Sequence, residues 1–210
     1  MEAKFTEQES IEIITEMINR ARNNVRKGKA NSMIFNGYVA AIIAIANFIL
    51  LQVLPKEYFF YSFYIWCLMF PVVIIDHFID RKVDKVSIVK TEIDKIISSA
   101  WYGFTISTFA FIIVLLAAGL FFNEWKLLSV ITPAVLFMVA IPEFITARAC
   151  RFKPFFWGAI IFWLSALLCI VSIYVFKRAD LQFIIFMISM VFGFIIPGHK
   201  LNKLADKTYV

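Results

Sequence analysis

The chain has 210 residues, of which 61% are hydrophobic and only 17% are charged, and its mean hydropathy is +0.81. A soluble domain of this length carries more polar surface and shorter apolar runs, so the composition excludes that class and predicts an all-α integral membrane protein in the lipid bilayer. The net charge of +6 lies in short islands beside the apolar runs, which fits contact with anionic lipid and excludes a nucleic-acid-binding domain.

Residues 1–32 form a polar and charged segment that is expected to be cytoplasmic, with no cleavable signal peptide. It opens with Thr6 and Glu9, which have the spacing of a capping box at a helix start. Residues 6–27 then predict an amphipathic helix, because apolar side chains recur on one face at helical spacing. These include Ile11, Ile14 and Ile18.

Six apolar stretches are long enough to cross a bilayer, since about 20 helical residues span its hydrocarbon core of about 30 Å. They cover residues 33–54, 58–79, 100–122, 127–147, 155–176 and 181–198. Short turns join them in pairs on one side of the membrane. The sequence therefore predicts a transmembrane domain of three helical hairpins over residues 33–200, followed by a cytoplasmic tail over residues 201–210.

The connector at residues 81–99 carries a second amphipathic pattern on the cytoplasmic side. Its charged residues, Asp94 among them, are expected on the outer face of a helix over residues 83–99. The apolar positions are Val86, Val89, Ile93, Ile96 and Ile97. Two interpretations remain open for both amphipathic helices: they lie on lipid or pack against each other, or they form a docking surface for a cytoplasmic protein.

Lysine and arginine residues define the orientation, because positively charged loops resist translocation. Seventeen of them fall on the side of the two termini and four fall on the other side. Both termini are therefore predicted to lie in the cytoplasm.

The three hairpins share an equal spacing of residues. A glycine near the start of each first helix is followed 39 residues later by an aspartate or a proline; the pairs are Gly37 and Asp76, Gly103 and Pro142, and Gly158 and Pro197. The pattern favours a threefold pseudo-symmetric bundle of parallel repeats. Three hairpins that cross one bilayer also have similar lengths for that reason alone.

Ionisable residues near the ends of the spans are candidates for function, because charge inside a membrane is costly. They are Asp76, His77, Asp80, Glu143 and His199, all expected at one depth near the cytoplasmic boundary. Carboxylates and imidazoles at one level could hold a divalent metal or form a proton-linked gate. The alternative is that these groups reach water and pair with nearby cations such as Arg148.

Other sites for chemistry are scarce in the sequence. Asn47 is the clearest polar residue near the middle of a span, and we expect it to form a hydrogen bond between helices. The cysteines Cys67, Cys150 and Cys169 form no metal-binding pair motif, and no cofactor is expected. No phosphate-binding loop, HExxH or GxSxG motif occurs, so enzymatic activity is not expected.

Three short strings resemble a family of small six-span bacterial inner-membrane proteins. They are residues 6–14 followed by Met17 and Ile18, Phe152-Lys153-Pro154 with Gly158, and residues 195–198. The resemblance supports the topology and hints at a sensory or regulatory role. Because that family has no assigned activity, the resemblance implies no catalytic or ligand residue.

The leading hypothesis is a non-enzymatic membrane protein that senses or scaffolds, presenting residues 6–27 and 83–99 to a cytoplasmic partner. The second is a small transporter or channel gated near Asp76, His77, Glu143 and His199. A third is a pore-forming effector that acts on its own membrane. Each of the three is compatible with a homo-oligomer.

Overall fold

The computed structural model describes residues 29–72, 74–75, 78 and 92–208, and within them the chain is helical with no β-strand. The α-helices are α2 (Lys29–Val53), α4 (Glu92–Phe122), α5 (Ile131–Ala149), α6 (Lys153–Tyr174), α7 (Leu181–Met190) and α8 (Ile196–Thr208). Two 3₁₀ helices, η1 (Lys56–Leu68) and η2 (Trp125–Val130), and a π-helix, η3 (Val191–Ile195), complete the order. The predicted all-helical class is confirmed for these residues.

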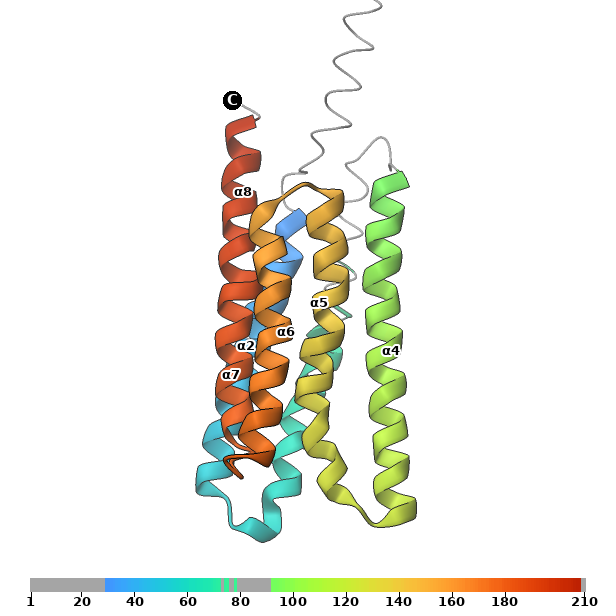
Figure 1. Ribbon diagram of the computed structural model, residues 1–210, viewed down its shortest axis with the longest axis vertical. Helices are drawn as coiled ribbons and strands as arrows, with labels where there is room; N and C mark the ends of the chain where they lie inside the picture. Colours follow the sequence, from blue (N-terminus) through green and yellow to red (C-terminus); the bar gives the residue numbers. More distant parts are fainter. Residues whose placement is uncertain (1–28, 73, 76–77, 79–91, 209–210) are drawn as a thin grey trace, which may run out of the picture.

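The helices lie side by side along the long axis of the bundle (Figure 1). Five helical stretches are long and apolar enough to cross a membrane: Asn31–Val53, Glu92–Phe122, Trp125–Ala149, Lys153–Tyr174 and Leu181–Leu204. The last of them is one rod made of α7, η3 and α8, whereas α4 stands at the edge of the bundle (Figure 1).

The core lies between α2, α5, α6 and α7. Ala44, Leu136, Phe162 and Phe183, one from each helix, are at most 1% exposed and belong to one apolar cluster. Small side chains on α2 and α6 let the helix backbones approach closely. Large apolar side chains cover the exterior as well, which suits a surface in contact with lipid.

The segment expected as a second α-helical span, residues 58–79, begins as the 3₁₀ helix η1 and continues as a short helix to Val72. With about three residues per turn, side chains three positions apart lie directly above one another. Tyr58, Tyr61 and Tyr64 accordingly stack along η1, with both successive ring centroids 5.9 Å apart. This row of aromatic contacts fits the 3₁₀ geometry, which helical periodicity alone did not predict.

The helix α4 joins two elements that the sequence analysis treated separately. The expected connector helix at residues 83–99 and the span at 100–122 meet in one continuous helix from Glu92 to Phe122. Asp94, expected on the outer face, is buried, and Ile93 is 49% exposed. The expected position of Asp94 on the outer face is therefore wrong, whereas the role of Ile93 as an interaction residue stays a prediction.

The three glycines of the proposed repeat have different surroundings. Gly37 packs against Ile195, and Gly158 packs against Gly193, whereas no described residue places an atom within 4 Å of a Cβ built on Gly103. The peripheral position of α4 accounts for the difference (Figure 1). Threefold pseudo-symmetry is therefore not confirmed.

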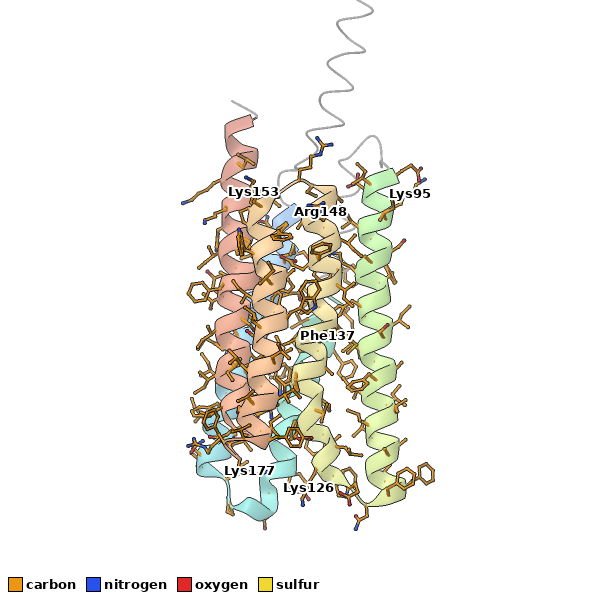
Figure 2. The ribbon with its side chains drawn as sticks, viewed as in Figure 1. Lys95, Lys126, Phe137, Arg148, Lys153 and Lys177 are labelled. Atoms are coloured by element: carbon orange, nitrogen blue, oxygen red, sulfur yellow. The ribbon has the colours of Figure 1, made fainter. Side chains whose placement is uncertain are left out.

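Charged residues separate to the two ends of the bundle. Figure 2 shows Lys95, Arg148 and Lys153 at one end, and Lys126 and Lys177 at the other. These five residues, which the charge analysis counts on opposite sides of the membrane, thus lie at opposite ends of the bundle.

Candidate functional site

Glu143 places a carboxyl group inside the bundle. It lies on α5, six residues before the helix ends at Ala149, which is about 9 Å along the helix axis. The side chain is 0% exposed, and neither carboxyl oxygen has a hydrogen-bond partner among the described residues. The alternative that Glu143 reaches water or pairs with Arg148 does not hold here, because Arg148 is exposed and forms no ion pair with it.

The carboxyl of Glu143 lies against a close crossing of α6 and η3. A Cβ built on Gly158 would lie 2.7 Å from the carbonyl oxygen of Gly193 and 3.2 Å from Oε1 of Glu143. A Cβ on Gly193 would lie 2.4 Å from the ring of Phe162. Gly158 therefore lets the main chains approach, Gly193 leaves room for the ring of Phe162, and the carboxyl lies beside that contact.

The winding of η3 presents a main-chain oxygen to the same place. Pro197 has no N–H group, so it cannot supply the bond that a regular α-helix would give to the carbonyl of Gly193. The chain instead takes π geometry over Val191–Ile195, and the N–H of Ile196 bonds to the carbonyl of Val191. Short π segments of this kind are frequent at functional sites.

A hydrogen-bond chain connects this region to α4. The Nε1 of Trp101 on α4 donates to Oγ1 of Thr146 at 3.1 Å, and that hydroxyl donates to the carbonyl of Pro142 at 2.7 Å. The ring of Trp101 also packs against Phe194 of η3, with the centroids 5.7 Å apart. Pro142 immediately precedes Glu143, so Trp101 ties α4 to the turn of α5 that carries the buried carboxyl.

The other predicted ionisable residues do not join Glu143 in the described structure. His199 is exposed, and its Nε2 shares a hydrogen bond with Oη of Tyr38 at 3.2 Å. Asp76, His77 and Asp80 lie outside the described residues. Within the described part of the chain, no group of three or more His, Cys, Asp or Glu side chains is placed to hold a metal ion.

The predicted docking residues are mostly outside the described ranges. Of the six, only Ile93 is described, and it is exposed at the start of α4. The others are Ile11, Ile14, Ile18, Val86 and Val89.

Asn47 has the role expected of it. Its side chain is fully buried, and its Nδ2 donates to the carbonyl of Ser62 at 3.3 Å. The bond joins α2 to η1, as the interhelical hydrogen-bond interpretation predicted.

At the opposite end of the bundle, a charged cluster closes the turn between α6 and α7. The carboxylate of Asp180 accepts hydrogen bonds from Arg178 at 2.7 and 2.9 Å and from Gln52 of α2 at 3.0 Å. The hydrogen bonds from Arg178 lower the pKa of Asp180, although partial burial opposes them. Ser172 donates to the carbonyl of Arg178 at 2.6 Å, so the cluster ties three helices together.

Sequence reasoning named Glu143 but missed its surroundings. The signal that could have found them is the spacing of Gly193 and Pro197, since a proline removes the donor for the carbonyl four residues earlier. The contact of Trp101 with Thr146 joins residues 45 positions apart, and no local pattern predicts it.

No protein-family model, curated protein or solved structure matches this chain, so the argument for its function rests on its own residues.

Proposed function

We propose that this protein is a non-enzymatic sensory or regulatory component of a bacterial inner membrane, with six spans in three hairpins and both termini in the cytoplasm. In this proposal, residues 6–27 and 83–99 face a cytoplasmic partner protein. The helix α4 transmits conformational changes between the membrane bundle and those segments.

The direction of the helices supports a sixth crossing. α2 and α4 run the same way along the bundle, so the chain between Val53 and Glu92 must return across it (Figure 1). The 13 residues of η1 extend about 26 Å at the rise of a 3₁₀ helix, close to the hydrocarbon thickness of about 30 Å. The separated charges in Figure 2 then favour the end with Lys95, Arg148 and Lys153 as the cytoplasmic end.

The observation that carries the proposal is the form of α4. Its 31 residues extend about 46 Å, more than the thickness of the hydrocarbon core, so one unbroken helix reaches from the connector through the membrane. Among the described elements it packs on α5 and η2 and leaves most of its surface exposed. A rod held along one side can tilt or shift without dismantling the core.

Photo-crosslinking in intact membranes tests this function. A photoreactive amino acid at Ile93, exposed at the start of α4, is expected to capture one partner protein. The same probe at Ile113, which is 65% exposed in the middle of α4, serves as the matched control and should capture lipid only. Deletion of residues 1–28 should abolish the Ile93 adduct. An adduct pattern that is the same at both positions, or that survives the deletion, would contradict the proposal.

The second candidate is a small transporter or channel, favoured by the buried carboxyl of Glu143. It predicts ion flux across liposomes that contain the purified protein. A flux that is unchanged by E143Q would exclude Glu143 as the coupling group.

A further inference from the structure

The buried carboxyl of Glu143 needs a physical explanation that does not depend on a partner protein. An ionised carboxylate in an apolar interior is costly unless a positive charge or several hydrogen bonds compensate it. Even a neutral carboxyl without a hydrogen bond costs about 1–3 kcal/mol. A leucine or methionine would fill a similar volume without that cost, so the position favours a role for the carboxyl itself.

No protein cation compensates Glu143 among the described residues. The other charged or titratable side chains at this end of α4 are Glu92, Asp94, Lys95 and Tyr102. Those on the remaining elements at this end are Tyr38 on α2, Arg148 on α5, Cys150 and Arg151 in the turn between α5 and α6, Lys153 on α6, and His199, Lys200 and Lys203 on α8. All except Asp94 and the partly buried Cys150 are exposed, and none bonds to Glu143. The described side chains therefore supply no charge that compensates an ionised Glu143.

The oxygen atoms at and near Glu143 indicate which kind of cation could bind there. One carboxylate lies beside Gly158, and the carbonyl of Gly193 approaches the same glycine. Within the described part of the chain, Glu143 belongs to no group of three or more His, Cys, Asp or Glu side chains that could hold a divalent metal. A single negative charge together with a neutral carbonyl oxygen matches one monovalent cation.

We propose that Glu143, at the crossing of Gly158 and Gly193, is a reversible binding site for one monovalent cation, either a proton or a sodium ion. The proton would form the neutral carboxylic acid, and the sodium ion would pair with the carboxylate. Both neutralise the same buried group, and experiment distinguishes them.

The test uses the full-length protein in liposomes and the apolar reagent dicyclohexylcarbodiimide. The carboxylic acid adds across one C=N bond of the reagent: its oxygen bonds to the central carbon and its proton passes to nitrogen. The acyl group then migrates to that nitrogen, and the whole reagent stays attached as a stable N-acylurea. Intact mass and peptide mapping locate the adduct.

We expect an adduct on Glu143 at pH 6 that is absent in E143Q and retained in E92Q, the matched exposed carboxylate. Loss of the adduct as the pH rises to 9, with or without sodium, identifies the proton. Protection by sodium at constant pH, without protection by choline, identifies the sodium ion. An adduct on Glu143 that responds to neither pH nor sodium would overturn the proposal.

Infrared difference spectroscopy keeps the test decisive if the reagent fails to reach the site. A step in pH or in sodium concentration should change a carboxyl C=O or carboxylate band in the wild-type protein and in E92Q. E143Q should lack that band. Either step should change the thermal stability of E143Q less than that of the wild-type protein. Spectra of the wild type and E143Q that are identical in both steps would overturn the proposal.

Discussion

Gly158 and Gly193 are examples of residues whose importance lies in the atoms they lack. A Cβ on Gly158 would meet the main-chain oxygen of Gly193, which cannot rotate away as a flexible side chain could. Gly103 occupies the corresponding place in another hairpin, yet a Cβ there would meet no atom of the described residues within 4 Å. Gly103 and Gly158 therefore have equivalent positions in the sequence spacing, but their surroundings in the structure differ.

We therefore expect G158A to lower the stability of the bundle by about 1–3 kcal/mol through overpacking. G103A should be neutral or slightly stabilising, because alanine favours helix by about 1 kcal/mol over glycine. Thermal unfolding of the detergent-solubilised protein, followed by circular dichroism, measures the difference. Equal melting temperatures for the two variants would contradict the close crossing of α6 and η3.

The cluster at Asp180 predicts a dependence of stability on pH. Because its pKa is lowered in the folded protein, the charged form stabilises the fold above the ordinary pKa of about 3.9, and this contribution is lost as the pH falls through the lower folded value. D180N should cost about 1 kcal/mol at pH 7. The deficit should shrink below about pH 4.

The control for D180N is E124Q, which changes an exposed carboxylate in the turn between α4 and η2. It should leave the unfolding midpoint nearly unchanged at either pH. A deficit in D180N that stays constant down to pH 3 would show that the change acts through something other than the charge of Asp180.

Glu143 shows how far single residues can be interpreted from sequence. A carboxylate near the end of an apolar run was identifiable as a candidate, but its burial was not. Burial depends on which helix face turns inward, and on Gly158, Gly193 and Phe162, which come from other segments. The apolar runs of this chain are apolar on every side, so periodicity does not distinguish the inner face.

A hydrogen bond from Trp101 joins α4 to α5. W101F keeps an aromatic ring but removes the hydrogen bond from Nε1 to Thr146. Loss of one such bond, worth about 1 kcal/mol, should speed local opening by about fivefold. Hydrogen exchange of residues 92–104, followed by mass spectrometry, measures that change.

W157F is the matched control for W101F, because Trp157 lies on α6 and is 61% exposed. Exchange in residues 92–104 should match the wild type in this variant. Unchanged exchange in W101F as well would mean that other contacts hold α4 against the bundle.

The helices differ in how well the sequence predicted them. The expected span 155–176 and the observed α6, Lys153–Tyr174, nearly coincide because Pro154 lies in the first turn of the helix and a turn follows its last residue. The connector and the span that follows it were expected as separate helices, but residues 92–122 form one helix because no glycine or proline separates the two. The 3₁₀ winding of η1 brings its tyrosines into a stacked row, a contact that average helix propensities do not represent.

The topology of the whole protein gives the clearest test in cells. In a variant without native cysteines, K126C and K177C should react with a membrane-impermeant maleimide added outside, because both residues lie at the end assigned to the exterior (Figure 2). K95C and K153C should react only after the cells are permeabilised. The reverse pattern would invert the proposed orientation.

The helical class of the described residues and most of their long apolar helices were predicted from the sequence, whereas the predicted threefold symmetry is not confirmed. Length and apolar composition determine whether a segment can span a bilayer, and both are local properties. The position of a helix at the centre or edge of a bundle depends on its neighbours. Ala44 and Ser165 are buried while Ala110 is exposed, although all three hold the same place in their hairpins.

The π segment also fixes the rotation of everything that follows it. It accommodates one residue more than α geometry would, and each residue turns a helix by about 100°. Deleting one residue from Val191–Ile195 would restore regular α-helical geometry but rotate α8 about the helix axis by that angle. Leu201 would leave its cluster with Ile34, and Asn202 would lose its hydrogen bond to Asn31. The extra residue of the π segment thus determines which face of α8 contacts the beginning of α2.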